Sequence, residues 1–344
     1  MIQAALSKLI ERSDLTFDEA RASVLDIFSG ATPPSVIAGF LIALRAKGET
    51  VDEIAGAADA MRHAATRIHP AGRPVVVDTC GTGGDRQGSF NISTAAAFVV
   101  AGAGVPVAKH GNRSISSKCG SADVLEALGV NIDPGPAVVE KCLRTIGIAF
   151  LFAPAFHPAM KHAMPVRREL GVRTVFNLLG PLTNPAGATA QVIGVFSAAM
   201  AETIARVLVR LGTRYSLVVH GSGHDEIVLS GTTDCVEIMD GRVRKRKLAP
   251  ADFGFKRHAP GLLAGGDKED NAEILRRVLS GAPGPERDAV VANAAAALWV
   301  AARAGGRADL KTLKEARRVA EASIDSGEAR GKLKKLAALS NAPR

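Results

Sequence analysis

The sequence predicts an α/β protein with a small all-α domain beside a large α/β domain whose sheet is mainly parallel. Residues 1 to about 69 carry helix signals, including the capping boxes Thr16-x-x-Glu19 and Thr50-x-x-Glu53, and no strand signal. From Pro74 onward, short β-branched runs alternate with helical patterns, which is typical of a doubly wound sheet. A chain of 344 residues is long enough for one large domain with a smaller companion.

The expected strands of the large domain are short apolar runs at residues 75–77, 105–108, 149–152, 191–196 and 216–220, with late edge strands at 227–229 and 236–238. The expected helices lie at 121–128, 137–146, 198–211, about 270–280, 286–304 and 308–325. Residues 157–185 break this rhythm, because Pro165 interrupts a helical pattern and residues 180–185 form a rigid Gly-Pro-Leu-Thr-Asn-Pro turn. We therefore expect an all-α domain of residues 1–70 completed by about 160–186, and an α/β domain of residues 71–159 and 187–344.

Composition narrows the class of protein only loosely. No apolar run approaches about 18 residues, so no membrane span is expected, and the N-terminus lacks a signal-peptide pattern, which predicts a cytoplasmic protein. The four cysteines show no C-x-x-C spacing, so we expect reduced thiols and no structural zinc. A formal net charge of +9 is compatible with nucleic acid, with a polyanionic small substrate and with a plain basic surface.

The stretch from Asp78 to Thr94 is the first candidate site. It contains Gly-Thr-Gly-Gly-Asp at residues 81–85, between a β-branched run and an alanine-rich helical run. A glycine loop in this position gathers main-chain N–H groups and the positive end of a helix dipole, which together bind anions. The loop has neither a Walker ending nor G-x-G-x-x-G spacing, so we expect a phosphate loop of another kind.

A second polar cluster, residues 109–121, also follows an expected strand and precedes a helix. Its sequence is Lys-His-Gly-Asn-Arg-Ser-Ile-Ser-Ser-Lys-Cys-Gly-Ser. The cations, serines and glycines suit a ligand with several phosphate groups, and the cluster should lie at the same sheet edge as the first loop. The alternative is a solvated turn, which would require two polar glycine loops to share one edge by chance.

Two further clusters carry charge. Asp225 and Glu226 follow a strand and a glycine turn and could hold Mg²⁺, although an Asp-Glu pair taken alone is usually surface charge. Arg167 and Arg168 lie in a proline-bounded segment, and an arginine there could bind a carboxylate bidentately; spacing does not decide which of the two. The basic run at residues 242–247 is expected to be a solvated loop.

In these motifs the chain resembles the anthranilate phosphoribosyltransferases. The signature Gly-Thr-Gly-Gly-Asp…Asn-Ile-Ser-Thr stands at residues 81–85 and 91–94, and Lys-His-Gly-Asn-Arg…Ser-Ser-Lys at 109–113 and 116–118. Gly-Pro-Leu-Thr-Asn-Pro stands at 180–185, and the metal-binding pair is Asp225-Glu226. The resemblance covers nearly the whole chain in the right order. It implies a sheet of the nucleoside phosphorylase and phosphoribosyltransferase type and a homodimer formed through the α domain.

The resemblance also implies a reaction in tryptophan synthesis, in which the amino group of anthranilate displaces pyrophosphate from 5-phosphoribosyl 1-diphosphate (PRPP). Carried over by position, the residues that would bind PRPP are Gly81, Gly84, Asp85, Ser89, Asn91, Ile92, Ser93, Thr94, Lys109, His110, Gly111, Asn112, Arg113, Ser114, Ile115, Ser116, Ser117 and Ser121. Those that would bind anthranilate or line its path are Gly81, Asn112, Arg167, His110, His157 and Met160. The resemblance implies two Mg²⁺ per monomer, held by Ser93, Asp225 and Glu226.

The chemistry of this reaction predicts no indispensable acid or base. The leaving group is pyrophosphate and the amine has a neutral lone pair, so alignment and charge neutralisation should supply the catalysis. Arg86, Cys119 and His224 depart from the family pattern without removing a functional group, and Arg86 could add a phosphate contact. The rivals are a pyrimidine nucleoside phosphorylase and a nucleic-acid-binding relative. Both leave the anthranilate and magnesium motifs unexplained, so we expect neither nucleic acid nor membrane as a partner.

Overall fold

The computed structural model describes residues 1–70, 72–85, 87–114, 118–305 and 309–342. Four helices come first: α1 (Ile2–Ile10), α2 (Phe17–Phe28), α3 (Pro34–Lys47) and α4 (Val51–His63). Both predicted capping boxes form, with the Thr16 and Thr50 hydroxyls accepting the N–H groups of Glu19 and Glu53. The buried Glu53 also accepts the Leu15 N–H at 2.9 Å and pairs with Lys47 at 3.0 Å, so it ties the loop before α2 to the end of α3.

A seven-stranded sheet forms the centre of the larger part, in the order β3-β2-β1-β4-β5-β6-β7. Pairing is parallel from β3 to β5 and antiparallel from β5 to β7. The mainly parallel sheet predicted from the sequence is therefore confirmed. The strands are β1 (Val77–Asp78), β2 (Val107–Gly111), β3 (Ile148–Phe152), β4 (Ala190–Gly194), β5 (Tyr215–Gly221), β6 (Thr233–Met239) and β7 (Arg242–Leu248).

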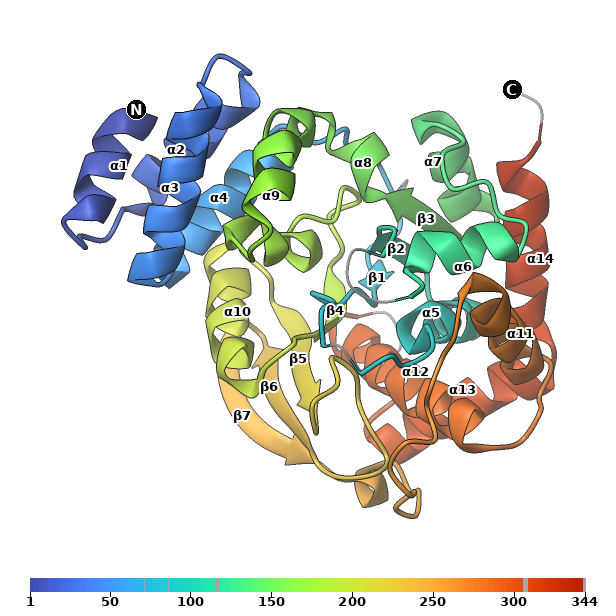
Figure 1. The fold of residues 1–344 in the computed structure, drawn as a ribbon. Coiled ribbons are helices and arrows are strands. Elements are labelled where there is room, and N and C mark those ends of the chain that lie inside the picture. The colour runs from blue at the N-terminus through green and yellow to red at the C-terminus, as the bar shows by residue number, and fades with distance from the viewer. Residues whose placement is uncertain (71, 86, 115–117, 306–308, 343–344) are drawn as a thin grey trace.

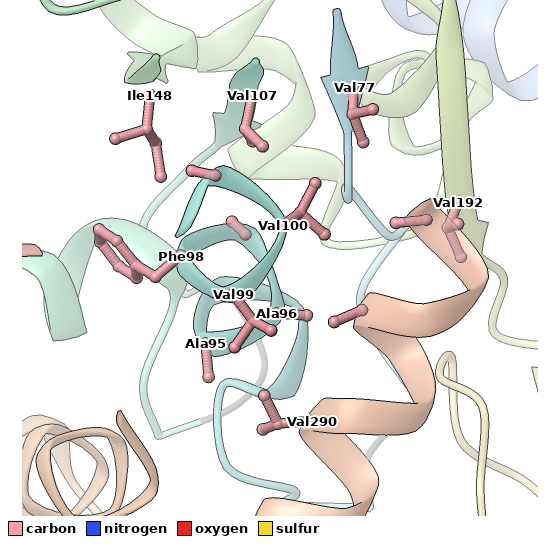
Figure 2. Packing of buried hydrophobic residues seen from close by; sticks show 14 of the residues in the cluster. Val77, Ala95, Ala96, Phe98, Val99, Val100, Val107, Ile148, Val192 and Val290 are labelled. Atoms are coloured by element: carbon pink, nitrogen blue, oxygen red, sulfur yellow. The ribbon is translucent and has the colours of Figure 1, made fainter. Parts of the chain in front are cut away.

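Helices cover both faces of this sheet (Figure 1). On one face α5 (Ile92–Gly102) and α12 (Pro285–Arg303) pack under Val77, Val107, Ile148 and Val192, as Figure 2 shows. On the other face lies α10 (Ala198–Arg210), whose buried side chains share a core with the N-terminal helices. Other helices of the larger part are α6 (Ser121–Ala127), α7 (Pro136–Thr145), η4 (Pro250–Asp252), α11 (Lys268–Leu279), α13 (Leu313–Asp325) and α14 (Glu328–Ser340).

Residues 153–182 form short helical pieces beside the N-terminal helices: α8 (Ala153–Phe156), η1 (Pro158–His162), α9 (Met164–Leu170), η2 (Val175–Asn177) and η3 (Gly180–Leu182). Their apolar side chains share a core with α2 and α3, and the Phe176 ring lies 6.1 Å from that of Phe28. Pro165 was expected to interrupt a helix, but it lies in the first turn of α9, where proline lacks only an N–H that has no helical partner.

Two local predictions were wrong. Residues 227–229 form no strand but an irregular segment with buried side chains. The N–H and C=O groups of Ile227 are both hydrogen-bonded to the side-chain amide of Asn293. The basic run from Arg242 is not a loop but β7, the edge strand, which pairs with β6 over its whole length. Its positive charge suits that position, because charged side chains at an exposed edge oppose pairing with another chain. No helix in the described ranges is long and apolar enough to cross a membrane.

Candidate active site

The first glycine loop is held against two other segments at the carboxyl end of the sheet. The Thr82 N–H donates to the Gly194 carbonyl at the end of β4 (2.8 Å), and the Gly83 N–H donates to Asp225 Oδ2 (2.9 Å). A side chain on Gly81 would place its Cβ only 2.8 Å from the same carboxylate oxygen. Gly83 and Gly84 have φ of 64° and 78°, in the region that favours glycine. The glycines therefore permit both the turn and the close approach of Asp225.

Asp225 and Glu226 lie across the loop from the start of α5. Glu226 Oε1 accepts the Ser93 N–H at 3.1 Å, and the buried Lys109 donates to the Thr79 carbonyl (2.8 Å) and the Ser93 hydroxyl (3.4 Å). Gly194 makes room for the pair, since a Cβ there would overlap the Asp225 carbonyl oxygen. Burial raises the pKa of both carboxyls, and a neighbouring carboxylate raises each of them further. Asp85 raises the pKa of Asp225, and Asp225 raises the pKa of Glu226. A cation would relieve this repulsion.

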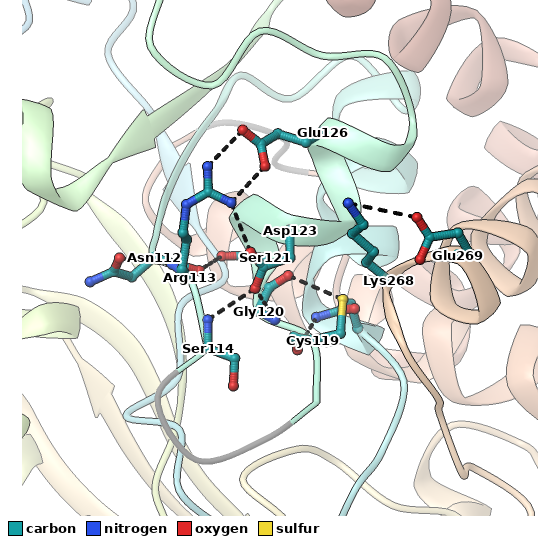
Figure 3. A network of polar contacts seen from close by, with 11 residues as sticks. Asn112, Arg113, Ser114, Cys119, Gly120, Ser121, Asp123, Glu126, Lys268 and Glu269 are labelled. Carbon is teal, nitrogen blue, oxygen red and sulfur yellow. Dashed lines mark hydrogen bonds and ion pairs between the residues drawn. The ribbon is translucent and has the colours of Figure 1, made fainter.

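The second loop is organised by one carboxylate of α6 (Figure 3). Asp123 Oδ2 accepts the N–H groups of Ser114 (3.0 Å) and Gly120 (2.8 Å). Arg113 is bound to the acids of α6, with Nη1 2.9 Å from Asp123 Oδ1 and 2.6 Å from Glu126 Oε2. Its charge is thus already paired, which sequence reasoning did not anticipate. Ile115, Ser116 and Ser117 of this loop lie outside the described residues, as does Arg86 of the first.

The two loops and the start of α5 are connected by side chains. Asn91, the residue before α5, donates from Nδ2 to the Cys119 carbonyl at 3.3 Å, while its buried Oδ1 has no partner among the described residues. Ser89 Oγ lies 2.8 Å from His224 Nδ1, and that nitrogen lies 4.0 Å from Asp85 Oδ2. Ile92 and Thr94 are buried in α5 and fix the orientation of its first turn.

A buried aspartate anchors the Gly-Pro-Leu-Thr-Asn-Pro turn to the sheet. Asp78 accepts the His110 N–H at 3.1 Å and the Asn184 amide at 2.8 Å, and Asn184 also donates to the Ala108 carbonyl at 2.8 Å. Burial raises the Asp78 pKa to about 6. Sequence reasoning gave Asp78 and Asn184 no role. The available signals were an acid directly after a buried strand and an asparagine inside a proline-bounded turn.

An aromatic pair lies between this turn and the N-terminal helices. The rings of His110 and His157 are 5.1 Å apart, edge to face, and His110 Nδ1 lies 2.9 Å from the Gly180 carbonyl. Nε2 of His110 makes no hydrogen bond within the described residues, and the His157 ring lies near the main chain of Thr183 and Met61. Burial lowers the pKa of His110 to about 4 and that of His157 to about 3. Both rings are therefore neutral at pH 7 and form an uncharged aromatic wall.

Arg167 of α9 is a half-buried cation without an acid partner. Among the described residues, no carboxylate oxygen lies within 4.0 Å of its guanidinium, which lies 5.5 Å from the centre of the Phe176 ring. Burial lowers its pKa, as expected where the charged form is poorly solvated. It makes no hydrogen bond to Asn112 or Gly81 within the described chain. Met160 of η1 packs against the same core. An anionic ligand would satisfy this arginine.

A segment near the C-terminal helices supports the far end of the first loop, and no sequence motif indicated it. Phe90 N–H donates to the Leu263 carbonyl at 3.0 Å, and Gly265 N–H donates to the Gly88 carbonyl at 2.8 Å. Ser89 and Ala264 form the intervening antiparallel bridge. A Cβ on Gly265 would lie 2.8 Å from the Phe90 Cα, so this contact requires glycine. The segment holds Ser89 in place.

Comparison with known proteins assigns the chain to a family. Residues 73–330 match the family described as "Glycosyl transferase family, a/b domain", and residues 3–65 match "Glycosyl transferase family, helical bundle domain". The chain is 53% identical to the anthranilate phosphoribosyltransferase of Symbiobacterium thermophilum over 336 residues, 97% of this chain and 96% of the relative. The chain belongs to the anthranilate phosphoribosyltransferase family.

Solved structures of anthranilate phosphoribosyltransferases have the same fold. That of Thermus thermophilus is 46% identical and superimposes with a TM-score of 0.91, over 98% of this chain and 99% of that one. That of Saccharomyces cerevisiae, solved in complex with PRPP and Mg, is 30% identical and superimposes with a TM-score of 0.87, over 98% of this chain and 97% of that one. The family expected from the motifs is confirmed. The chain is an enzyme of pentosyl transfer in tryptophan biosynthesis, which joins the phosphoribosyl group of PRPP to anthranilate.

Proposed function

We propose that the transfer takes place at the edge of the sheet where β1, β2, β4 and β5 end. The anthranilate nitrogen forms the new bond to the ribose C1, the bond from C1 to the pyrophosphate oxygen breaks, and the nitrogen loses one proton. The observation that carries this assignment is the contact between Gly83 N–H and Asp225 Oδ2, because it joins an anion-binding loop to a cation-binding carboxylate. A pyrophosphate group requires both an anion-binding loop and a bound cation.

PRPP is proposed to occupy the space between the two glycine loops and the start of α5. Main-chain N–H groups of residues 81–85 other than those of Thr82 and Gly83, which already have partners, would face the pyrophosphate, and the first turn of α5 would face a phosphate group. The full proposed set is Gly81, Gly84, Asp85, Ser89, Asn91, Ile92, Ser93, Thr94, Lys109, His110, Gly111, Asn112, Arg113, Ser114, Ser121 and, outside the described residues, Ile115, Ser116 and Ser117. Lys109 and Arg113 would act mainly by holding these segments, since both already have partners.

Magnesium is proposed to bind at Ser93, Asp225 and Glu226. The donors are all oxygens, as a hard cation prefers, and burial first and neighbouring carboxylates second raise the pKa of both carboxyls, which a bound cation would counteract. Within the described chain, no group of three or more His, Cys, Asp or Glu side chains could hold a metal ion by itself. The remaining ligands of two Mg²⁺ per monomer would therefore be hydroxyl groups, water and the phosphate oxygens of PRPP. Bound magnesium would neutralise the leaving pyrophosphate.

Anthranilate is proposed to bind between Arg167 and the two histidines. Arg167 lacks an acid partner among the described residues and suits the carboxylate, while the neutral rings of His110 and His157 suit the benzene ring. Gly81, Asn112 and Met160 would complete the site. Because neither histidine is protonated near pH 7, we assign neither as an acid or base, and we attribute catalysis to alignment and charge neutralisation.

The proposal extends to the organisation of the protein. Residues 1–70 with about 160–186 would form the α domain, and 71–159 with 187–344 the PRPP-binding domain. A homodimer would form through the α domain, where Ile10 of α1 and Ile42 of α3 are 70% and 40% exposed although both are large and apolar. We place the enzyme in the cytoplasm and assign no role to nucleic acid.

The test follows anthranilate fluorescence during incubation with enzyme, PRPP and Mg²⁺. We expect the fluorescence to decay only when all components are present and pyrophosphate to be released in equal amount. Chelation of magnesium should stop the decay, and readdition should restore it. Decay without PRPP, or none in the complete mixture, would contradict the proposal.

A further inference from the structure

We propose that Arg173 is a positioning residue for the pyrophosphate loop, holding Gly84 from the side of the segment that carries the anthranilate arginine. This inference rests on the proposed function. Arg173 lies between α9 and η2, outside every motif found in the sequence.

Three successive residues of the glycine loop are each held by a different element. Thr82 donates to Gly194 at the end of β4, and Gly83 donates to Asp225 after β5. The third, Gly84, accepts a hydrogen bond at its carbonyl from Arg173 Nη2. A Cβ on Gly84 would lie 2.6 Å from that nitrogen. The first two supports belong to the sheet edge, whereas the third reaches the loop from the short helical pieces beside the N-terminal helices.

The Arg173 guanidinium is fixed in place and has no counter-ion among the described residues. It lies 4.1 Å from the centre of the Phe196 ring, and Phe196 follows β4 two residues after Gly194. No carboxylate oxygen within the described ranges lies within 4.0 Å of it. A cation that lacks an acid partner beside a phosphate loop adds attraction for an anion, and the aromatic ring restricts its rotamers. Arg173 thus resembles Arg167, which also packs on a phenylalanine.

The backbone on both sides of Arg173 is held by local structure, which restricts the position of its side chain. On one side Gly171 ends α9 in the left-handed conformation, with φ 63°. On the other, the Asn177 side chain caps η2 by accepting the Thr174 N–H at 3.0 Å, and Val175 and Phe176 are buried. One short segment therefore presents Arg167 towards the proposed anthranilate site and Arg173 towards the proposed pyrophosphate site.

A merely structural role, covering the Phe196 ring, would alter folding stability and leave the two Michaelis constants in their original ratio. A positioning role changes the constant for PRPP selectively, because Gly84 belongs to the PRPP loop. The test compares Arg173→Gln and Arg173→Lys with the wild type. The matched control is Arg168→Gln, since Arg168 is an exposed arginine of α9. Steady-state kinetics with each substrate varied in turn give both constants, and calorimetry with Mg²⁺ and pyrophosphate measures binding directly.

For Arg173→Gln we expect KM for PRPP to rise and pyrophosphate affinity to fall by about tenfold, the effect of one charge-assisted hydrogen bond. KM for anthranilate should change by less than about twofold, since Arg167 remains in place. Arg173→Lys keeps the charge but not the planar guanidinium, so its KM for PRPP should lie between those of the wild type and Arg173→Gln, roughly threefold above the wild type. Arg168→Gln should match the wild type.

An unchanged KM for PRPP in a folded Arg173→Gln enzyme would overturn the inference, as would a selective rise in KM for anthranilate. If thermal melting shows that the Gln variant does not fold, the Lys variant decides: an unchanged KM for PRPP in that enzyme rejects the inference. Failure of the proposed function has a different signature, because the wild type itself would then not consume anthranilate.

Discussion

The Asp225 carboxylate accepts the main-chain N–H of Gly83 at 2.9 Å, across 142 positions of sequence. An acid that belongs to the proposed metal pair thus also fixes the turn of the first glycine loop. Because a carboxylate oxygen can accept a hydrogen bond and bind a cation at the same time, binding of a cation at Asp225 and the conformation of the loop should be linked.

The first prediction concerns the acid pair. Asp225→Asn together with Glu226→Gln should lower turnover by at least about a hundredfold and raise the magnesium concentration needed for half-maximal rate. The same variant should melt at a higher temperature than the wild type in the absence of magnesium. The reason is that burial and mutual repulsion raise the pKa of both carboxyls, so the charged pair costs folding free energy at pH 7 and above. Unchanged magnesium dependence would contradict the metal assignment.

The second prediction concerns Gly194. A methyl group there would overlap the Asp225 carbonyl oxygen, so Gly194→Ala should displace the segment that carries Asp225 and Glu226 and reduce the free energy of unfolding by about 2–4 kcal/mol. Urea titration measures the loss. The control is Gly331→Ala in α14, where no atom lies within 4 Å of the new Cβ; it should be neutral or slightly stabilising. Equal stability of the two variants would refute the steric role of Gly194.

The third prediction concerns pH. The unfolded chain protonates a histidine below about pH 6.5, whereas folded His157 and His110 stay neutral down to about 3 and about 4, so stability is lost as the pH falls. Between pH 6.5 and 5 each histidine should contribute up to about 2 kcal/mol of this loss. Asp78 acts in the opposite sense below its pKa of about 6, since the folded state then binds more protons.

Comparing variants separates the effect of His157 from that of Asp78, because Asp78 is present in every protein compared. His157→Gln should lose less stability than the wild type between pH 7 and pH 5 in urea titrations. His69→Gln, at an exposed position, should show the pH dependence of the wild type. The same dependence of the free energy of unfolding on pH in all three proteins would show that His157 is not buried in the neutral form.

The fourth prediction concerns the absence of an essential base. His110→Ala should bind anthranilate more weakly but keep turnover far above the uncatalysed rate, because the amine nucleophile needs no deprotonation before attack. Turnover at saturating substrates should also show no inflection near pH 6.5. Loss of activity to the uncatalysed level in a folded variant would establish His110 as an acid or base.

The features that the sequence predicted are those encoded locally. Strand-glycine-helix patterns predicted that the two glycine loops lie at one sheet edge, and the Asp225-Glu226 pair, which follows a strand and a glycine turn, gained weight only from the polyphosphate ligand expected there. Asp78 with Asn184 was missed because the two residues are 106 positions apart and each is an ordinary residue when taken alone. The same holds for Arg173, since spacing does not reveal which carbonyl a lone arginine contacts. The wrong loop at Arg242 has another cause: an edge strand tolerates charge on nearly every residue, so the alternation that marks strands is lost.

The bridge between residues 88–90 and 263–265 has a consequence for synthesis of the chain on the ribosome. The first glycine loop emerges early, but its partners appear in sequence: Arg173, then Gly194, then Asp225, and last residues 263–265. A nascent chain that ends before Leu263 lacks the partners of both Phe90 and Gly88. Because α12, which packs against α5, β4 and β5, follows Gly265 in the chain, the core beneath the sheet is also completed only after these residues have been made. Closure of the sheet core and of the candidate site should therefore both wait for the C-terminal helices, and a stall in translation before them should leave both unfinished.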